Sequence, residues 1–420
     1  MSVKKASIVV SLLFILHAAC AYSEEGMGTR LGSLIDEALL NNPKVKAEYD
    51  KYSAKRSEAI QVGALPDPKL SYSYFGESVE TRVGPQENKY GASQTIPFPG
   101  KLILKRQAVK KEAAILKERY EAQKRELEKN VRFTYYDIFW MDRAIDITQQ
   151  EKSIIDNLEK VAKKKYETAM SPQQDVIKAQ VEISKLIDKL FMLKAHRKSL
   201  EAKMNSLLSR PKATPFDKVQ EIDIEEFDYS LADLHKMAGR TRHELIAANL
   251  DIERAEYQRS LANLDFLPDF SFGFDYIDVG DGKTMQADDG KDAWMTTFTV
   301  SVPIWLDKQV AGVEEKQAVL RSSKSNYEDI KNTVIYEVED IYYKIIAYRD
   351  IVGLYETALV PQTEQAFEAS RTAYEAGKVD FLNWLDAERV LLQTKLAYYK
   401  SIVDYEKSIA YLERVVGQDL

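Results

Sequence analysis

Six aspartates crowd one short stretch of the sequence and are the first candidates for metal ligands: Asp275, Asp278, Asp281, Asp288, Asp289 and Asp292. A calcium-binding loop needs acidic residues at fixed alternate positions, a glycine at the sharp turn and a closing glutamate. The six aspartates do not follow that spacing. We therefore expect a solvated loop at this place and no metal site.

The other residue types that carry chemistry give no site either. The chain contains four His and one Cys, and His196, His235 and His243 lack a partner at the spacing with which a helix presents two zinc ligands. The sequence has no glycine-rich phosphate loop and no nucleophile elbow. We therefore predict that the protein is not an enzyme and has no cofactor.

The charged residues are spread along the 420-residue chain. Lys and Arg together number 59 and Asp and Glu 66, so that the formal net charge is −7. A nucleic-acid-binding protein needs a basic stripe that faces the phosphates. Because no such stripe is present, we do not expect nucleic acid as a partner.

The N-terminus has the order of segments found in a secretory signal peptide. Two lysines precede an apolar run over residues 8–16, and small residues follow it. We predict that residues 1–21 are a signal peptide removed on export. A second possibility is that Cys20 is retained and lipidated, which would anchor the mature chain. No later apolar stretch reaches the roughly 18 to 20 residues of a membrane-spanning helix.

The remainder of the sequence is duplicated. Leu65-Pro66-Asp67 returns as Leu267-Pro268-Asp269, and Tyr166-Glu167 returns as Tyr374-Glu375. The offset grows only from 202 residues (267 − 65) to 208 (374 − 166) between these pairs. Collinear matches of this kind predict two structural repeats with few insertions between them.

We place the first repeat at residues 22–210 and the second at residues 230–420. Residues 211–229 form an equatorial linker between them, either a belt around the molecule or a plain connection. Each repeat is predicted to contain a helix, two short strands, a very long helix and another helix. The predicted ranges are 33–64, about 68–76, 89–97, 99–167 and 172–209 in the first repeat, and 230–265, about 269–278, 292–303, 307–376 and 379–416 in the second.

Each repeat is dominated by one helix that is too long for a compact globular core. Residues 101–171 contain neither Gly nor Pro and are rich in residues that favour helix. At about 1.5 Å per residue, a helix over residues 99–167 is about 100 Å long. The two shorter helices of a repeat together match this length, so we expect them to pack end to end beside it. Residues 183–207 carry the seam of a coiled coil, which leaves a structural coiled-coil protein as an alternative.

The strands alternate between two kinds of side chain. Aromatic residues occupy one face and small or polar residues the other, as in Phe270, Phe272, Phe274 and Tyr276 against Ser271, Gly273 and Asp275. This alternation fits a sheet that lies between hydrocarbon and water. A half-buried soluble sheet is the alternative. Four strands cannot close a barrel, so copies must combine; two give eight strands and three give twelve, and a channel favours three or more.

The whole mature sequence resembles the outer-membrane efflux factors of the TolC type. The resemblance is carried by Leu65–Pro68, by Gln94–Leu102, and by Tyr374–Gly377 followed by Leu385-Asp386-Ala387. It implies a mainly α fold with a small β part. In that fold a long α-helical barrel of coiled-coil-like hairpins joins a transmembrane β-barrel, which trimerisation completes with four strands per chain.

The resemblance also implies a function and partners. The protein would be the outer-membrane exit duct of a tripartite efflux system in a Gram-negative-type cell, spanning into the periplasm and passively conducting metal cations or small toxic compounds. Its partners would be two further copies in a homotrimer, a periplasmic adaptor (membrane fusion) protein, an inner-membrane pump and outer-membrane lipid. The run Pro97–Lys101 resembles the branch that works with proton-driven heavy-metal pumps of the RND type. A duct for type I protein secretion and a non-channel periplasmic coiled-coil protein are the alternatives.

Two turns would then form the periplasmic tips at which an adaptor docks. Their residues are Ala169, Met170 and Ser171 in the first repeat and Gly377, Lys378 and Val379 in the second. Gly377 allows the left-handed backbone that ends a helix. Because the first repeat has Ala169 at this place, we expect its cap to be made in another way, with Pro172 opening the next helix.

The resemblance also implies a closed aperture above the tips that acidic residues surround. The matching positions are Asp175, Asn383 and Asp386, with Asn383 where the family often has Asp. The family's basic partner of this gate is missing, because Val379 occupies its place. Acids on a solvated helix surface are the alternative. Pro361 lies inside the second long helix and is predicted to kink it, whereas the first repeat has no proline there.

Overall fold

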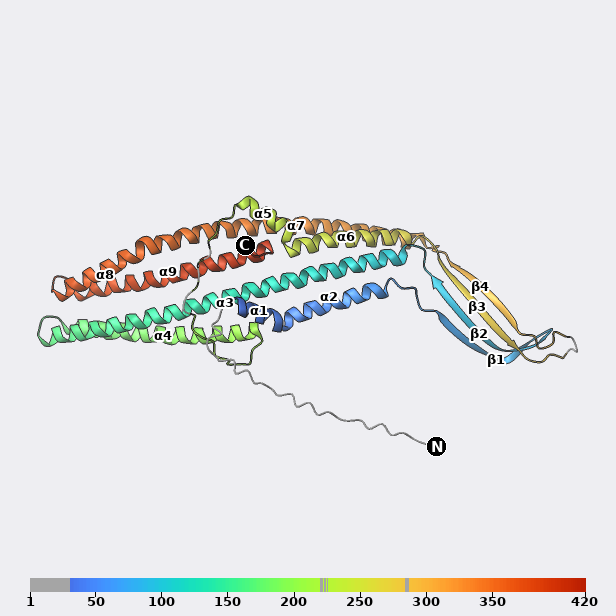
Figure 1. Ribbon diagram of the computed structural model, residues 1–420, viewed down its shortest axis with the longest axis horizontal. Coiled ribbons are helices and arrows are strands. Elements are labelled where there is room, and N and C mark those ends of the chain that lie inside the picture. The colour runs from blue at the N-terminus through green and yellow to red at the C-terminus, as the bar shows by residue number, and fades with distance from the viewer. Residues whose placement is uncertain (1–30, 220–221, 223, 225, 284–286) are drawn as a thin grey trace, which may run out of the picture.

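The computed structural model describes residues 31–219, 222, 224, 226–283 and 287–420. The predicted signal peptide and Cys20 lie outside these residues. Figure 1 shows an elongated molecule in which helices run along most of the length and the strands extend from one end. Among the described helices, none has both the length and the apolar composition that crossing a membrane requires.

The first repeat is built around one continuous helix. Its elements are α1 (Leu31–Asn41), α2 (Pro43–Gln61), β1 (Lys69–Thr81), β2 (Gly84–Ile96), α3 (Lys101–Glu167) and α4 (Gln173–Leu208). The 67 residues of α3 extend for about 100 Å. Both α2 and α4 pack against α3, one along each half of its length (Figure 1).

The second repeat has the same order of elements. They are α5 (Leu231–Thr241), α6 (His243–Leu264), β3 (Asp269–Val279), β4 (Ala293–Ser301), α7 (Leu306–Leu354), the π-helical turn η1 (Tyr355–Leu359), α8 (Val360–Glu375) and α9 (Phe381–Val416). The two repeats join side by side, because α3 packs on α6 and α9 of the second repeat. The chain therefore forms two helical hairpins, α3–α4 and α8–α9, whose turns lie at the end of the molecule opposite the sheet (Figure 1).

The helix expected over residues 33–64 is divided in two. Asn42 has an extended backbone, with φ −65° and ψ 121°, and its side chain accepts a hydrogen bond from the backbone N–H of Lys44. Pro43 follows as the first helical residue, where its missing N–H costs nothing. The apolar pattern predicts one helix here, but the Asn-Pro pair starts a second helix within it.

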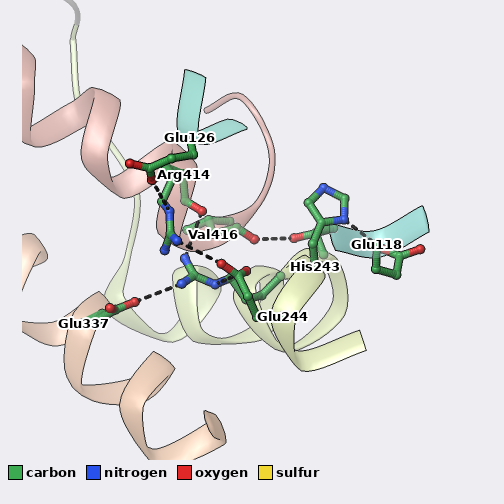
Figure 2. A network of polar contacts seen from close by, with 9 residues as sticks. Glu118, Glu126, His243, Glu244, Glu337, Arg414 and Val416 are labelled. Atoms are coloured by element: carbon green, nitrogen blue, oxygen red, sulfur yellow. Dashed lines mark hydrogen bonds and ion pairs between the residues drawn. The ribbon is translucent and has the colours of Figure 1, made fainter. Parts of the chain in front are cut away.

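The helix expected over residues 230–265 is divided in the same place of the second repeat, at Arg242. This residue is 5% exposed and pairs with Glu337 of α7 at 3.2 Å. Figure 2 shows the network around it, in which Arg414 of α9 bonds Glu126 of α3 at 3.1 Å and Glu244 of α6 at 2.9 Å. Charged groups from four helices therefore contact one another at this break, in the middle of the molecule.

The helix expected over residues 307–376 is interrupted as well. The π-turn η1 precedes Pro361, which lies in the first turn of α8. A proline inside a helix removes one backbone hydrogen bond and its ring clashes with the preceding turn. A π-turn relieves that clash by inserting an extra residue into the helical turn. The distortion predicted at Pro361 therefore takes the form of a π-bulge. The corresponding helix of the first repeat, α3, has no such bulge.

The four strands form one antiparallel sheet in the order β1-β2-β3-β4. The first hairpin is longer than the predicted ranges 68–76 and 89–97, because Thr81 pairs with Gly84 across a two-residue turn. Gly84 has φ +134°, which a residue with a side chain rarely adopts. Since β2 pairs with β3, the two repeats share one continuous sheet.

Candidate functional site

One face of the sheet is aromatic and exposed. Tyr72, Tyr90, Tyr276 and Trp294 stand opposite one another in register and form a row across all four strands. Their side chains are 62%, 49%, 41% and 68% exposed, respectively. Exposed aromatic residues in such numbers mark a surface that a partner or a membrane covers. Tyr and Trp are the residues that favour the boundary between hydrocarbon and water.

The opposite face of the sheet is polar. Lys89 and Asp275 form an ion pair at 3.2 Å on it. Side chains converge over Gly91, since a Cβ at this position would lie 2.5 Å from both the Asp275 carboxylate and the Ser71 hydroxyl. The sheet therefore separates an apolar side from a polar side, as the alternation in the sequence predicts.

Asp275 and Asp278 lie within β3 and not in the expected loop. Aspartates at the end of β3 and in the loop that follows it bond to protein groups. Asp288 pairs with Arg82, and Asp278 accepts a hydrogen bond from Asn88 at 2.9 Å. Asp292 accepts a hydrogen bond from the backbone of Val279 at 3.0 Å. No group of three metal-ligating side chains occurs among the described residues. These contacts fasten the loops at the end of the sheet to one another.

At the opposite end, both hairpin turns have the same cap. The N–H of Lys378 donates to the carbonyl of Ala373 at 2.9 Å, and that of Met170 donates to the carbonyl of Lys165 at 2.7 Å. In both turns the preceding residue is left-handed, with φ +73° at Gly377 and +55° at Ala169. The expectation of a different cap in the first repeat is therefore wrong. Ala169 adopts the glycine conformation at a steric cost that the hydrogen bond offsets.

Ala169→Gly is accordingly expected to stabilise the protein by about 0.5 to 1 kcal/mol, because glycine adopts a positive φ without steric cost. Thermal unfolding of the purified protein measures this gain. Glu167→Gly is the matched control, since Glu167 is the last exposed residue of α3 and should lose stability on becoming glycine. A loss of stability at both positions would contradict the strain at Ala169.

The predicted aperture residues lie just above these turns, on the first turns of α4 and α9. Asp380 caps α9 by accepting a hydrogen bond from the backbone of Asn383 at 2.9 Å. Asn383 and Asp386 are exposed on the surface of α9, whereas Asp175 on α4 is half-buried.

Asp175 differs electrostatically from the other two residues. Burial raises the pKa of its carboxyl, the ammonium of Lys178 opposes that shift, and the carboxylate of Asp380 adds to it. By the offset of 208 residues, Asp175 corresponds to Asn383 and Lys178 to Asp386. The two hairpins thus present different charges at the same height, and each chain is asymmetric around its tip.

A buried acid lies higher in the same hairpins. Glu151 of α3 is 4% exposed, and its Oε1 has no hydrogen-bond partner among the described residues. Burial raises the pKa of its carboxyl from 4.5 to about 7; Lys395 and Lys189 oppose this shift and Glu182 adds to it. The ionised form is therefore costly in the folded protein.

This raised pKa makes stability depend on pH. Below about pH 4.5 Glu151 is protonated in the folded and the unfolded protein and does not change the free energy of unfolding. As the pH rises from about 4.5 to about 7, the unfolded chain gives up this proton more readily than the folded protein does, so the free energy of unfolding falls. At pH 8 this loss should be on the order of 2 to 3 kcal/mol. Glu151→Gln should thus stabilise the protein more at pH 8 than at pH 4.5, as thermal unfolding at both values measures. Glu167→Gln, on an exposed residue, should show no such difference; equal shifts for both variants would contradict the prediction.

Two residues at the tips carry no signal in the sequence that would single them out. Tyr374 is 3% exposed and packs in a buried cluster formed by α3, α4, α8 and α9. Lys165, at the end of α3, reaches this tyrosine across the two hairpins. Tyr374 stands out only as part of a repeated motif, and Lys165 is one of several lysines in the last turns of α3.

The known proteins with which the chain can be compared share this duplicated architecture. The sequence model of the outer membrane efflux protein family matches residues 34–209 and, a second time, residues 234–418. These two matches cover most of the chain and coincide with the two repeats. The chain belongs to the outer membrane efflux protein family. Its fold is accordingly mainly helical, with an internal two-fold duplication and four antiparallel strands.

Solved structures agree with this membership. A crystal structure of CusC, from work on folding and transmembrane channel formation, is similar with a TM-score of 0.77 over 93% of this chain and 92% of that chain, at 18% identity. The outer membrane protein VceC from Vibrio cholerae gives a TM-score of 0.78 over 93% and 97% of the two chains, at 17% identity. Likeness at these identities shows the fold.

One curated relative is more similar in sequence over a short segment. The cobalt-zinc-cadmium resistance protein CzcC of Cupriavidus metallidurans is 33% identical over 60 residues, which are 14% of this chain and 14% of that protein. As a family member, this efflux protein resides in the outer membrane and extends into the periplasm. That location excludes the alternative of a structural coiled-coil protein of the periplasm, and the family is not one of enzymes.

Proposed function

We propose that this efflux protein is the exit duct of a tripartite system, in which three copies share one β-barrel and one helical tunnel. The duct passively conducts its cargo to the exterior from a periplasmic adaptor and an inner-membrane pump. The observation that carries the proposal is the sheet, which has an aromatic face, a polar face and two edges that no other strand pairs with in the described part of the chain.

The free edges call for further copies of the chain. Among the described strands, β1 pairs with β2 alone and β4 with β3 alone. Unpaired backbone groups in hydrocarbon cost several kcal/mol each, and pairing β4 of one copy with β1 of the next satisfies both edges. Three copies supply twelve strands, more than the roughly eight whose interior side chains fill. The polar face then lines a water-filled passage and the aromatic face contacts lipid.

The cargo that we propose is a metal cation. The matched segment of CzcC belongs to a protein named for cobalt, zinc and cadmium resistance, and the run Pro97–Lys101 resembles the branch that works with heavy-metal pumps of the RND type. Small toxic compounds would pass through the same duct, because the pump selects the cargo. The adaptor would dock on the two tips, residues 169–171 and 377–379.

We also propose that Asp175, Asn383 and Asp386 surround the aperture. In a trimer the two aspartates contribute six carboxylates to a narrow passage, which favours cations. The exposure of Asn383 and Asp386 on α9 supports this role. Asp175 is half-buried beside Lys178, so its carboxylate should contribute less negative charge to the ring.

Planar-bilayer recording tests the channel directly. The purified protein should insert and give uniform conductance steps that are larger for cations than for anions. A variant that carries both Asp175→Ala and Asp386→Ala should conduct more in its resting state, because the smaller side chains widen the aperture. It should also lose part of the cation preference, because the carboxylates that attract cations are gone. Absence of conductance from protein that is folded and inserted would refute the duct. Unchanged conductance in the double variant would refute the ring alone.

A further inference from the structure

We propose that the Lys308 ammonium of one copy binds the Asp67 carboxylate of the next copy and thereby sets the register in which β4 and β1 pair between copies. The inference rests on the proposed function, in which the copies share one barrel. Asp67 lies two residues before β1, and Lys308 lies in the first turn of α7. The pair therefore joins two copies at the place where the sheet meets the helices.

The structure contains the same kind of contact between the two repeats of one chain. The Nζ of Lys101, the first residue of α3, donates to the Asp269 carboxylate at 2.9 Å and to the carbonyl of Leu267 at 3.0 Å. The Asp269 carboxylate also accepts a hydrogen bond from the backbone N–H of Phe98 at 2.8 Å. The Lys101 side chain is only 13% exposed. Lys101 thus fastens the start of α3 to the start of β3, across the boundary between the repeats.

Both partners of this contact have a counterpart in the other repeat. Asp67 matches Asp269, because each ends a Leu-Pro-Asp motif. Along the long helices the repeats are offset by 207 residues, since Val338 of α7 matches the valine at position 131 of α3 (338 − 131) and both are 0% exposed. The same offset takes Lys101 to Lys308. The second repeat therefore carries the lysine, and the first repeat the aspartate, of a second such pair.

Asp67 and Lys308 are exposed and lie at opposite edges of the molecule. The strands follow the order β1-β2-β3-β4, and Figure 1 shows the helices next to the sheet in the matching order α2, α3, α6 and α7. In this half, α3 packs between α2 and α6, and α6 packs between α3 and α7. Placing the β4–α7 edge of one copy on the β1–α2 edge of the next repeats the contact between the repeats. Head-to-tail contacts of this kind close into a ring, and each one brings Lys308 to Asp67.

The register between copies follows from the pairing inside the sheet. Ala92 of β2 stands opposite Phe274 of β3. The repeats are offset by 206 residues between β2 and β4 (303 − 97) and by 202 between β1 and β3 (267 − 65). Phe298 of one copy then stands opposite Tyr72 of the next. Both side chains belong to the aromatic face, where they are 58% and 62% exposed, whereas a slip by one residue would place polar residues of the other face opposite them.

The alternation of side chains alone does not fix this register. A slip by two residues keeps every side chain on its own face. Such a slip moves one strand past the other by about 7 Å, which takes an ammonium out of the roughly 4 Å reach of an ion pair. The Lys308–Asp67 pair therefore selects one register among those that the two faces allow. Because Lys308 belongs to α7, the same pair also sets the height of α7 against α2 of the next copy.

Charge reversal tests the pair. Lys308→Glu alone and Asp67→Lys alone should each lower the amount of trimer in outer membranes about tenfold, because like charges then face each other. A variant with both substitutions has opposite charges again and should regain most of the wild-type amount. Asp307→Lys is the matched control, because Asp307 is the adjacent exposed residue of the same turn. A double variant that assembles no better than the single ones, or an equal loss in Asp307→Lys, would overturn the pair.

Disulfide formation tests the register and separates it from the duct. Ser71→Cys and Thr299→Cys together place two thiols that should stand opposite each other between copies, so that oxidation joins the chains covalently. Ser71→Cys with Thr297→Cys is the control, since these thiols meet only after a slip by two residues. Lys308→Glu should weaken the first cross-link and strengthen the second.

The outcomes distinguish the two proposals. If the first cross-link forms in a protein that is inserted but does not conduct, the duct fails and the register between copies stands. If the protein conducts but the first cross-link does not form, or forms no better than the second, the register fails and the duct stands. A first cross-link that Lys308→Glu leaves unchanged would show that the register is set without the ion pair and would overturn the role of Lys308.

Discussion

Phe298→Arg is expected to prevent assembly in the outer membrane, whereas Thr297→Arg on the same strand is expected to be tolerated. Phe298 is 58% exposed and stands opposite Phe272 on the aromatic face of the sheet, 5.0 Å between ring centres. Thr297 is exposed on the polar face. An arginine that faces lipid near the middle of a bilayer costs about 2 to 4 kcal/mol, and three copies multiply that cost.

The amount of trimer in purified outer membranes measures this difference. Both variants introduce the same charge one residue apart, so that effects on export or synthesis cancel. We expect wild-type amounts of trimer for Thr297→Arg and severe loss for Phe298→Arg. Equal amounts for the two variants would mean that the aromatic face does not contact lipid.

Gly417→Ala is expected to destabilise the middle of the molecule by about 3 to 4 kcal/mol. Gly417 ends α9 with φ +90°. A Cβ on this residue would lie 2.4 Å from the carbonyl oxygen of Thr241 and 3.0 Å from Cα of Arg242, both of them backbone atoms that cannot swing away. The same junction is held by the Thr241 hydroxyl, which donates to the carbonyl of Val416 at 2.7 Å. Any movement to admit the methyl group therefore strains the network of Figure 2.

Variants at two other glycines distinguish the two causes of this loss, which are backbone strain at a positive φ and steric overlap with neighbouring backbone atoms. Gly377 also has a positive φ, +73°, but nothing lies within 4 Å of its Cβ position, and Gly312 lies inside α7 with open space around it. Gly377→Ala should lose only about 1 kcal/mol from backbone strain, and Gly312→Ala should gain up to about 1 kcal/mol. Thermal unfolding ranks the three variants. If Gly417→Ala loses no more stability than Gly377→Ala, then Gly417 does not pack closely against the backbone of Thr241 and Arg242.

Local patterns in the sequence were enough for the architecture. The alternation around Phe272 has a period of two, and the helix formers of residues 101–171 have no breaker, so that these elements follow from the sequence alone. Collinear motifs revealed the duplication. Residues 169–171 and 377–379 do form the two hairpin turns, because each follows the last turn of a long helix.

Features that depend on tertiary packing were missed. Arg242 carries no local signal of a helix break and takes an extended backbone because its guanidinium bonds Glu337 of another helix. Nothing near Glu151 in the sequence distinguishes it from the exposed acids of α3, and its raised pKa results from the helices that cover it. At Ala169 the residue type predicts a different cap, but the hydrogen bond that ends the helix offsets a steric cost of only about 1 kcal/mol.

Native mass spectrometry of the protein, extracted from outer membranes in mild detergent, tests the shared barrel most directly. We expect one dominant species with the mass of three mature chains. Any constant excess per chain would report acyl groups on Cys20. A species of one chain that stays folded when the detergent is removed would contradict the account, because a lone four-stranded sheet with an exposed aromatic face and free edges could not then be one third of a membrane barrel.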